Sequence, residues 1–275
     1  MSFISNPSYK EIRQLYRPLQ PTIKKSDESV LYNEFLPHPN LQALIYCYWQ
    51  LKTTTLLQNP FNYRVVADGC IDIFFEANDP SLSFVMGFCK QYTSFELRES
   101  FHYVGIRFLP TMFPQLFRIN AAELSNRTEW LKEVLPNVAQ FIERALPTPF
   151  SPQKLKSIFD TYFLSLAAEM QFDNDPRLYE AIAIILKQLG VLNIEQDLKT
   201  GISPRQLRRL FKFYIGDTAK TFSKVVRFQN ILKAKPSTQS LKQSKLFYDT
   251  GFYDQSHFIK DFKHFYGVTP TEAYR

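Results

Sequence analysis

The last third of the chain contains one short sequence unit twice. The first copy, residues 201–216, reads GISPRQLRRLFKFYIG, and the second, residues 251–267, reads GFYDQSHFIKDFKHFYG. Each copy consists of a glycine turn, a helix-start signal, an amphipathic helix and a closing glycine. This is the pattern of a helix-turn-helix, in which a short turn leads into a helix that enters the DNA major groove. Two such units in one chain predict a DNA-binding protein.

Glycine usage supports the limits of both units. The chain has only 8 glycines, and four of them stand at these limits. Gly201 and Gly251 are predicted to adopt positive φ where one helix stops and the next begins. Gly216 and Gly267 are predicted to close the following helix with a left-handed residue.

Each predicted helix has an apolar face and a polar face. The helix starts are Ser203 followed by Pro204, and Asp254 followed by Gln255, which are favoured capping and first-turn residues. The apolar stripes, which should pack inward, are Leu207, Leu210, Phe211 and Tyr214 in the first helix and Phe258, Phe262 and Phe265 in the second. The opposite faces carry Arg205, Arg208, Arg209 and Lys212, and then Gln255, Ser256, Lys260, Lys263 and His264. A merely solvated face is the alternative for either helix alone, and its repetition favours DNA contacts.

The second unit also matches a longer signature. Residues 251–270 read GFYDQSHFIKDFKHFYGVTP, which resembles the GF-x-DQSHF-x-x-x-FK-x-x-x-G-x-TP signature of AraC/XylS-type transcription regulators. The resemblance covers residues 175–275 and implies two helix-turn-helix units that bind double-stranded DNA. The base-reading positions that it implies are Arg205, Arg208 and Arg209 in the first recognition helix and Gln255, Ser256 and Lys260 in the second. The predicted phosphate contacts are Lys212, Lys263 and His264.

The chain departs from the family pattern at two positions. The family usually has a small residue four positions before each turn glycine, whereas this chain has Asp197 and Phe247. A helix register shifted by one residue would turn Ile194 and Leu198 inward at the first of these positions.

Two further helices are predicted around the repeated units. The segment 217–235, DTAKTFSKVVRFQNILKAK, has one apolar side and is long enough to connect the two units as a strut. Such a strut can hold both recognition helices on one side of a duplex, in successive major grooves. Residues 175–187 form an amphipathic pattern that closes the core of the first unit.

The distribution of charge supports the same function. Residues 175–275 contain 17 Lys and Arg against 9 Asp and Glu, a net charge of +8, whereas the preceding 174 residues carry a net charge of −1. A basic domain beside a neutral one is typical of nucleic-acid binding, because phosphate contacts supply the non-specific affinity. A single-strand RNA binder would be expected to carry its aromatic residues on the exposed face instead.

The region from Tyr32 to Arg107 is predicted to be β-rich. Short alternating or apolar runs are separated by Pro, Asn, Asp and Gly, which favours a small barrel or sandwich. Three features also resemble the N-terminal domain that often precedes such regulators, namely a CYW strand at 47–49, an Asp-Gly pair at 68–69 and a G-x-R-F strand at 105–108. Trp49 and Arg107 are candidates for the lining of a ligand pocket, and a core role is the alternative for Trp49.

An enzymatic function is weighed as the alternative. The candidate groups are Asp68, Asp72, Glu76, Arg64, Arg107 and the four histidines His38, His102, His257 and His264. No pair of them has metal-ligand spacing and no nucleophile motif is present, so the sequence predicts no catalytic residue, no metal and no cofactor. Cys47, Cys70 and Cys89 lie in apolar runs without CxxC spacing, which favours a reducing compartment.

Residues 110–146 have a helical pattern, and residues 151–170 predict one amphipathic helix with a long apolar stripe. This stripe either packs on its own β domain or forms a homodimer seam. Residues 172–177, FDNDPR, break the helix before Pro176. The predicted division is therefore a β-rich sensory domain at 1–150, a helical linker or dimerisation segment at 151–174 and a DNA-binding domain at 175–275.

These observations predict an α+β N-terminal domain followed by an all-α domain with two helix-turn-helix motifs. The expected function is a sequence-specific DNA-binding transcription regulator, with a repair-type enzyme fused to a DNA-binding module as the alternative. A small-molecule effector, RNA polymerase and a second copy of the chain are compatible partners. The sequence has no signal segment and no apolar run of about 18 residues, which predicts a cytoplasmic protein without membrane contact.

Overall fold

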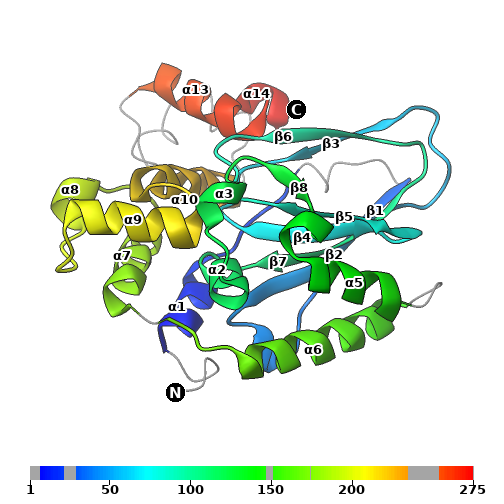
Figure 1. Cartoon of the computed structure of the whole chain (residues 1–275). Coiled ribbons are helices and arrows are strands. Elements are labelled where there is room, and N and C mark those ends of the chain that lie inside the picture. Colours follow the sequence, from blue (N-terminus) through cyan, green and yellow to red (C-terminus); the bar gives the residue numbers. More distant parts are fainter. Residues whose placement is uncertain (1–6, 22–28, 147–150, 174, 235–253, 275) are drawn as a thin grey trace.

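The β-rich region forms one six-stranded sheet and one two-stranded sheet (Figure 1). The computed structural model describes residues 7–21, 29–146, 151–173, 175–234 and 254–274. In the larger sheet the order is β1-β2-β7-β4-β5-β8, and its strands are β1 (Val30–Phe35), β2 (Ile45–Thr53), β4 (Ile71–Glu76), β5 (Asp79–Met86), β7 (His102–Phe108) and β8 (Thr128–Trp130). The smaller sheet pairs β3 (Phe61–Val65) with β6 (Thr93–Leu97). All these pairings are antiparallel.

The sequence left a small barrel or a sandwich open; the two sheets have a sandwich-like arrangement, and the described strands form no closed barrel. Neighbouring residues of β2 show how the faces divide, because successive side chains of a strand point to opposite sides. Tyr48 belongs to the core beneath the helices, whereas Trp49 belongs to a second apolar cluster beneath β3 and β6. The larger sheet therefore has helices on one face and the smaller sheet on the other.

The helices of this region precede, interrupt and follow the strands. They are α1 (Pro7–Leu15), the short 3-10 helix η2 (Pro39–Leu41), α2 (Met112–Phe117), α3 (Ala121–Leu124), α4 (Leu131–Val134), α5 (Pro136–Ala145) and α6 (Pro152–Glu169). The predicted helix at 151–170 is α6, with Ser151 as its N-cap. The helical pattern of residues 110–146 becomes four short helices, with β8 among them.

The apolar stripe of α6 packs against the chain's own sheet. Phe159 is fully buried, and its ring centroid lies 5.2 Å from that of Tyr48 and 6.3 Å from that of Phe75. Phe163, one turn later, lies 5.8 Å from Phe108. Of the two alternatives that the sequence left for this stripe, Phe159 and Phe163 have the internal packing on the chain's own sheet.

The C-terminal region is entirely helical in the residues that are described. Its helices are α7 (Pro176–Lys187), α8 (Ile194–Asp197), α9 (Pro204–Ile215), α10 (Ala219–Lys233), α13 (Gln255–Tyr266) and α14 (Pro270–Ala273). Helices α9 and α13 form where the sequence predicted the two recognition helices, and α10 and α7 form where it predicted the strut and the amphipathic helix. Gly251 and Phe247 lie outside the described residues.

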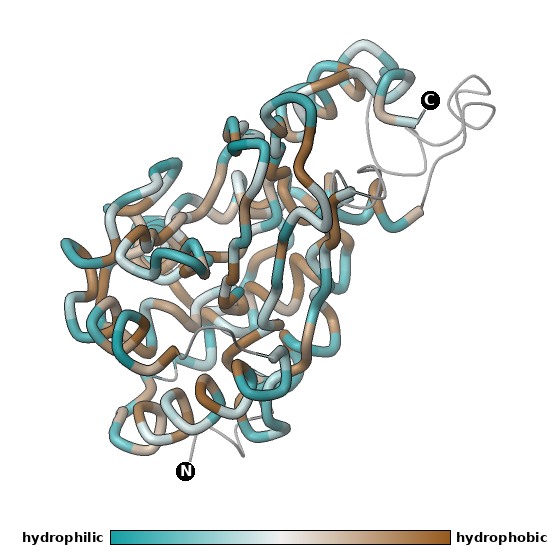
Figure 2. The backbone as a smooth tube through the Cα atoms, turned by 90° about the vertical axis from the view of Figure 1, so that its right-hand side faces the viewer, coloured by the Kyte–Doolittle hydropathy of each residue, from teal (hydrophilic) through white to brown (hydrophobic). Residues whose placement is uncertain are grey.

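One apolar core connects the two regions. It runs from Tyr9 in α1 to Ala273 in α14 and includes residues of the helix-covered face of the six-stranded sheet and of α7, α9, α10 and α13. Figure 2 shows the corresponding alternation of hydrophobic and hydrophilic stretches along the helices. None of the described helices is long and apolar enough to cross a lipid bilayer.

Candidate nucleic-acid interface and ligand cavity

The first candidate reading helix, α9, forms as its sequence dictates. The Ser203 hydroxyl accepts a hydrogen bond from the Gln206 amide at 3.3 Å, and Pro204 occupies the first turn. Gly216 ends the helix with φ of 108°, where an added Cβ would lie 2.9 Å from the Cβ of Phe88. Leu207, Phe211 and Tyr214 are buried in the core. The three predicted base-reading side chains of this helix, Arg205, Arg208 and Arg209, are all exposed.

The second candidate reading helix, α13, repeats this construction. Asp254 accepts a hydrogen bond from the His257 amide at 2.7 Å, which caps the helix start. Gly267 closes the other end with φ of 99°. The stripe of Phe258, Phe262 and Phe265 is buried, whereas the predicted reading residues Gln255, Ser256 and Lys260 are exposed.

The strut α10 carries both reading helices. Its Phe222 ring centroid lies 6.2 Å from that of Phe211 in α9. Two turns later, the Phe228 ring lies 5.7 Å from Phe262 and 5.3 Å from Phe265 in α13. Aromatic packing on one helix therefore fixes the mutual position of α9 and α13, and the polar faces of both remain in solvent.

The departure at Asp197 is resolved by a shift of register. Asp197 is exposed at the end of α8, where its carboxylate accepts a hydrogen bond from the Asn193 amide at 2.7 Å. Leu198 is buried and Ile194 is partly buried, so these apolar residues face the core in its place. An acidic side chain in this segment consequently needs no buried partner.

The exposed surface of α13 includes one residue that the sequence analysis did not single out. Ile259 is 37% exposed although it is a large apolar residue, and it lies one turn after Gln255 and Ser256 on the same side of the helix. Sequence reasoning assigned the polar residues to the reading face and the apolar residues to the core. The position of Ile259 outside the stripe of Phe258, Phe262 and Phe265 was the sequence signal that could have identified it as exposed. The predicted phosphate contacts Lys212, Lys263 and His264 are also exposed.

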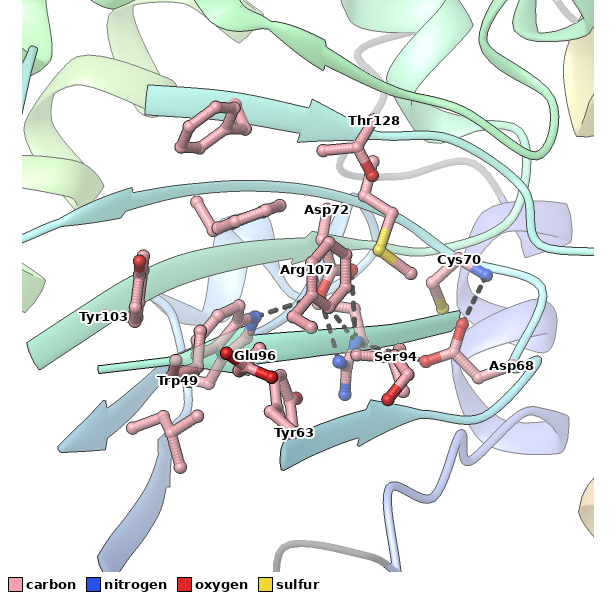
Figure 3. A pocket seen from close by; sticks show the side chains of 17 residues that line it. Trp49, Tyr63, Asp68, Cys70, Asp72, Ser94, Glu96, Tyr103, Arg107 and Thr128 are labelled. Carbon is pink, nitrogen blue, oxygen red and sulfur yellow. Dashed lines mark hydrogen bonds and ion pairs between the residues drawn. The ribbon is translucent and has the colours of Figure 1, made fainter. Parts of the chain in front are cut away.

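A cavity of about 380 Å³ lies between the six-stranded sheet and the two-stranded sheet (Figure 3). Strands β2, β4, β5 and β7 provide its floor, and β3 and β6 cover it. Both residues that the sequence proposed for a ligand pocket, Trp49 and Arg107, line this cavity. Trp49 is also buried, so its core role and its lining role coincide.

A network of buried charges stands at one end of the cavity. Asp72 and Arg107 are direct partners on neighbouring strands β4 and β7. The Arg107 Nη2 lies 2.9 Å from the Asp72 Oδ2, and the Arg107 Nε lies 3.4 Å from the Asp68 Oδ2. The Trp49 indole donates to Asp72 at 3.0 Å, and Gln20 donates to Asp68 at 2.8 Å. The two carboxylates thereby anchor Arg107 within the sheet.

This network shifts the proton affinities of its members. Burial raises the pKa of Asp72 to about 6, although the neighbouring Arg107 acts in the opposite direction. Burial by itself lowers the pKa of Arg107, but Asp72 and Asp68 raise the pKa by more, so the guanidinium stays charged. Charge is thus retained in an apolar setting because it is paired.

Gly105 gives Trp49 the space that it occupies over β7. The two residues are direct partners on neighbouring strands. A Cβ added at Gly105 would lie 2.1 Å from the Trp49 ring, so a side chain there would displace the indole. The glycine of the G-x-R-F strand therefore shapes the wall of the cavity.

The groups considered for an enzyme are only partly brought together. Asp68, Asp72 and Arg107 meet, whereas Glu76 accepts from the Asn78 amide in a neighbouring turn. No group of three or more His, Cys, Asp or Glu residues suited to a metal ion occurs among the described residues. Cys47, Cys70 and Cys89 are buried, and burial raises the thiol pKa of each, which is the reverse of what an activated nucleophile requires.

Two family models match the chain. Residues 33–130 match a domain of unknown function, DUF6597, and residues 198–275 match a helix-turn-helix domain. No sequence among the curated proteins matches. A crystal structure of ToxT from Vibrio cholerae O395 is 16% identical, with 90% of this chain and 97% of that chain covered and a TM-score of 0.37. A structure of unsaturated fatty acid bound wild-type ToxT from Vibrio cholerae strain SCE256 is 14% identical, covers 90% and 95%, and has a TM-score of 0.37.

The helix-turn-helix match begins at Leu198, the buried residue that precedes the first turn glycine, and it runs to the end of the chain. It therefore includes both reading helices and the signature from residue 251 to residue 270. The sequence signature, the two capped helices and the strut between them give one consistent assignment. Residues 198–275 therefore form an AraC-type helix-turn-helix domain, the DNA-binding part of a transcription regulator.

Proposed function

We propose that α9 and α13 read two successive major grooves of one duplex. The observation that carries the proposal is the packing of both helices on α10 with their polar faces exposed. Arginine can bond the O6 and N7 of guanine in a bidentate manner, and glutamine can bond adenine in the same way. The base-reading side chains are Arg205, Arg208 and Arg209 on α9 and Gln255, Ser256 and Lys260 on α13.

Phosphate contacts hold the two helices in register on the duplex. We assign this role to Lys212, Lys263 and His264, which are exposed and lie beyond the reading residues of their helices. The net charge of +8 in residues 175–275 supplies the non-specific attraction. Ile259 adds an apolar contact that suits a thymine methyl group.

The cavity beneath β3 and β6 is the proposed effector site. It is apolar, largely preformed and lined by a few charged groups, as small-molecule sites usually are. Its cover also contacts the reading helix α13. The Ala67 amide, just after β3, donates to the Phe265 carbonyl at 3.4 Å, and the Tyr92 amide, just before β6, donates to the His264 carbonyl at 3.2 Å. An occupant that moves the cover therefore moves α13.

The remaining parts of the proposal concern the cellular setting. A regulator of this kind acts in the cytoplasm, where RNA polymerase is the natural partner, and it performs no catalysis of its own. Homodimerisation stays a prediction, and the internal packing of Phe159 and Phe163 favours a surface other than the α6 stripe. A repair-type enzyme requires an activated cysteine, and the three buried thiols do not favour it.

Selection from a random duplex pool with the full chain tests the proposal. We expect a selected site with two conserved blocks separated by about one helical turn. Binding to that site should weaken steeply as salt rises, because each phosphate contact releases counterions. A pool without enrichment, or binding that does not respond to salt, would contradict the assignment. A scrambled duplex of the same composition is the control.

A further inference from the structure

We propose that the cavity between the two sheets binds an uncharged aromatic molecule whose oxygen accepts a hydrogen bond from the Nη1 of Arg107. This inference rests on the proposed function, since it names the class of effector for the site. Three properties of the cavity carry it: its walls, the buried Nη1 of Arg107, which is unpartnered among the described residues, and the charge of its lining.

The walls of the cavity select an aromatic body. Phe74 and Phe84 on the floor have ring centroids 5.4 Å apart, and Phe95 of β6 approaches Phe74 at 6.3 Å. Trp49, Tyr63 and Tyr103 complete the lining around them (Figure 3). Planar rings pack on such walls in stacked or edge-to-face arrangements, which adds to the gain from apolar burial. The volume of about 380 Å³ lies at the lower end of the range for small-molecule sites.

The unused donor selects an oxygen atom on the ligand. Arg107 is 2% exposed and lines the cavity. Its Nε and Nη2 donate to Asp72. Its Nη1 has no hydrogen-bond partner in the part of the chain that the structure describes, and the Glu34 carboxylate lies 3.9 Å away. A buried donor without an acceptor costs free energy, and a carbonyl or hydroxyl oxygen in the cavity would supply that acceptor.

The charge of the lining excludes an acid. The buried carboxylates of Asp68 and Asp72 line the cavity together with one guanidinium, and Glu96 adds a third carboxylate at an exposed position. Arg107 is therefore already neutralised, and the carboxylate of a bound acid would meet a surplus of negative charge in an apolar space. Contacts between like charges of this kind cost several kcal/mol.

The same network disfavours an amine. The inner carboxylates are engaged, because Asp72 accepts from Trp49 and Arg107 and Asp68 accepts from Gln20 and the Cys70 amide. An ammonium group would lose its hydration beside a guanidinium without gaining a free inner carboxylate. Glu96 is exposed, so it offers only a solvated partner at the mouth.

Three probes with one naphthalene skeleton test the inference by calorimetry on the full chain. They are 2-acetylnaphthalene, which is an uncharged ketone, 2-naphthoate and 2-naphthylmethylamine. We expect the ketone to bind roughly tenfold tighter than either charged probe, since one unfavourable charge contact costs at least that factor. Equal or tighter binding of the acid or the amine overturns the inference, and so does the absence of binding by all three.

Two substitutions locate the site. Ser94→Trp places a large side chain at an exposed position that lines the cavity, and it should abolish binding of the ketone. Ser81→Trp is the matched control, because Ser81 is an exposed residue of β5 outside the cavity. Unchanged ketone affinity in Ser94→Trp places the probe elsewhere and overturns the inference. Arg107→Met, if it folds, should remove the preference for the ketone over unsubstituted naphthalene.

Binding to the selected duplex is measured on the same preparations. A chain that binds its duplex but prefers the acid overturns the ligand class and leaves the proposed function intact. A chain that binds the ketone but binds no duplex overturns the proposed function and leaves the ligand class intact.

Discussion

Arg107 and Arg209 are the same type of residue in opposite surroundings, and this decides what each can do. Arg209 is exposed on α9, so its five donors are available to a base or a phosphate. Arg107 is buried, and its Nε and Nη2 are engaged by Asp72. Its long side chain can therefore orient only a small molecule that enters the cavity.

Replacing Arg209 by alanine should change sequence preference rather than general affinity. A bidentate arginine to guanine contact contributes about 1 to 3 kcal/mol of discrimination, so the variant should lose that preference at one base position. Titrations on the selected and scrambled duplexes measure it. Arg127→Ala, an exposed arginine of the N-terminal region, is the control. Equal losses on both duplexes would instead assign Arg209 to a phosphate.

His102 should make the fold sensitive to acid. Burial, together with a smaller effect of the Lys52 charge, lowers the pKa of His102 from an ordinary value of 6.5 to about 4. The unfolded chain then binds the proton more readily, so this contribution to stability is complete above pH 6.5 and is lost as the pH falls toward about 4. Urea unfolding of the wild type and of His102→Gln across this window tests the sign. The unfolding free energy of the wild type minus that of His102→Gln should decrease toward acid pH. A difference that does not change with pH would contradict the assignment.

For the network of Asp68, Asp72 and Arg107, the sequence could indicate individual residues but not their pairing. Arg107 and Trp49 could be proposed for a pocket from their strands alone, and Asp68 and Asp72 were considered only as candidate groups for an enzyme. Their pairing depends on the register of β4 against β7, which places Asp72 opposite Arg107. Register is set by contacts between strands far apart in the chain, so one sequence did not specify it.

Elements with strong local signals could be predicted almost to the residue. Helix α9 begins at Pro204 and α13 at Gln255, as their caps predicted, because a capping side chain and a glycine stop act over one turn. Helix α1 was missed. It has nine residues, too few for stability in isolation, and it is held by α7, where the Tyr9 and Tyr179 rings lie 5.0 Å apart. The three-residue strand β8 likewise depends on its pairing with β5.

Substitutions in helix α6 test whether its apolar stripe belongs to the core of the N-terminal domain. Phe159→Glu buries a charge against Tyr48 and Phe75, which should cost several kcal/mol and unfold the N-terminal domain. Thr161→Glu, on the exposed side of the same helix, should leave the fold unchanged. Circular dichroism melts together with sedimentation measure both properties. If Phe159→Glu is folded and forms a smaller oligomer than the wild type, the α6 stripe is a homodimer interface and not part of the core.

At the scale of the whole molecule, buried polar contacts join the two domains. Gln229 of α10 is fully buried, and its amide accepts from the Leu19 amide at 2.7 Å and donates to the Ala67 carbonyl at 2.8 Å. Ala67 in turn donates to Phe265 of α13. Leu19 and Gln229 are 210 residues apart in the chain. The sequence predicted a strut with one apolar side, but no local pattern could reveal that the hydrogen-bond partners of Gln229 lie in the other domain.

These contacts predict reciprocal coupling between the cavity and the duplex. Strands β3 and β6 cover the cavity, and the residues Ala67 and Tyr92 at their ends hold the backbone of α13. An occupant of the cavity changes the position of the cover, and α13 must then shift relative to α9 on α10. We expect 2-acetylnaphthalene to change the affinity for the selected duplex by roughly 5-fold to 150-fold, the usual range of such coupling. The duplex must change the affinity for the ketone by the same factor, since both measure one coupling free energy.

Titrations in both orders test this reciprocal coupling, with Ser94→Trp as the uncoupled control. Equal duplex affinity with and without saturating ketone would separate the cavity from DNA reading, even if both binding events occur.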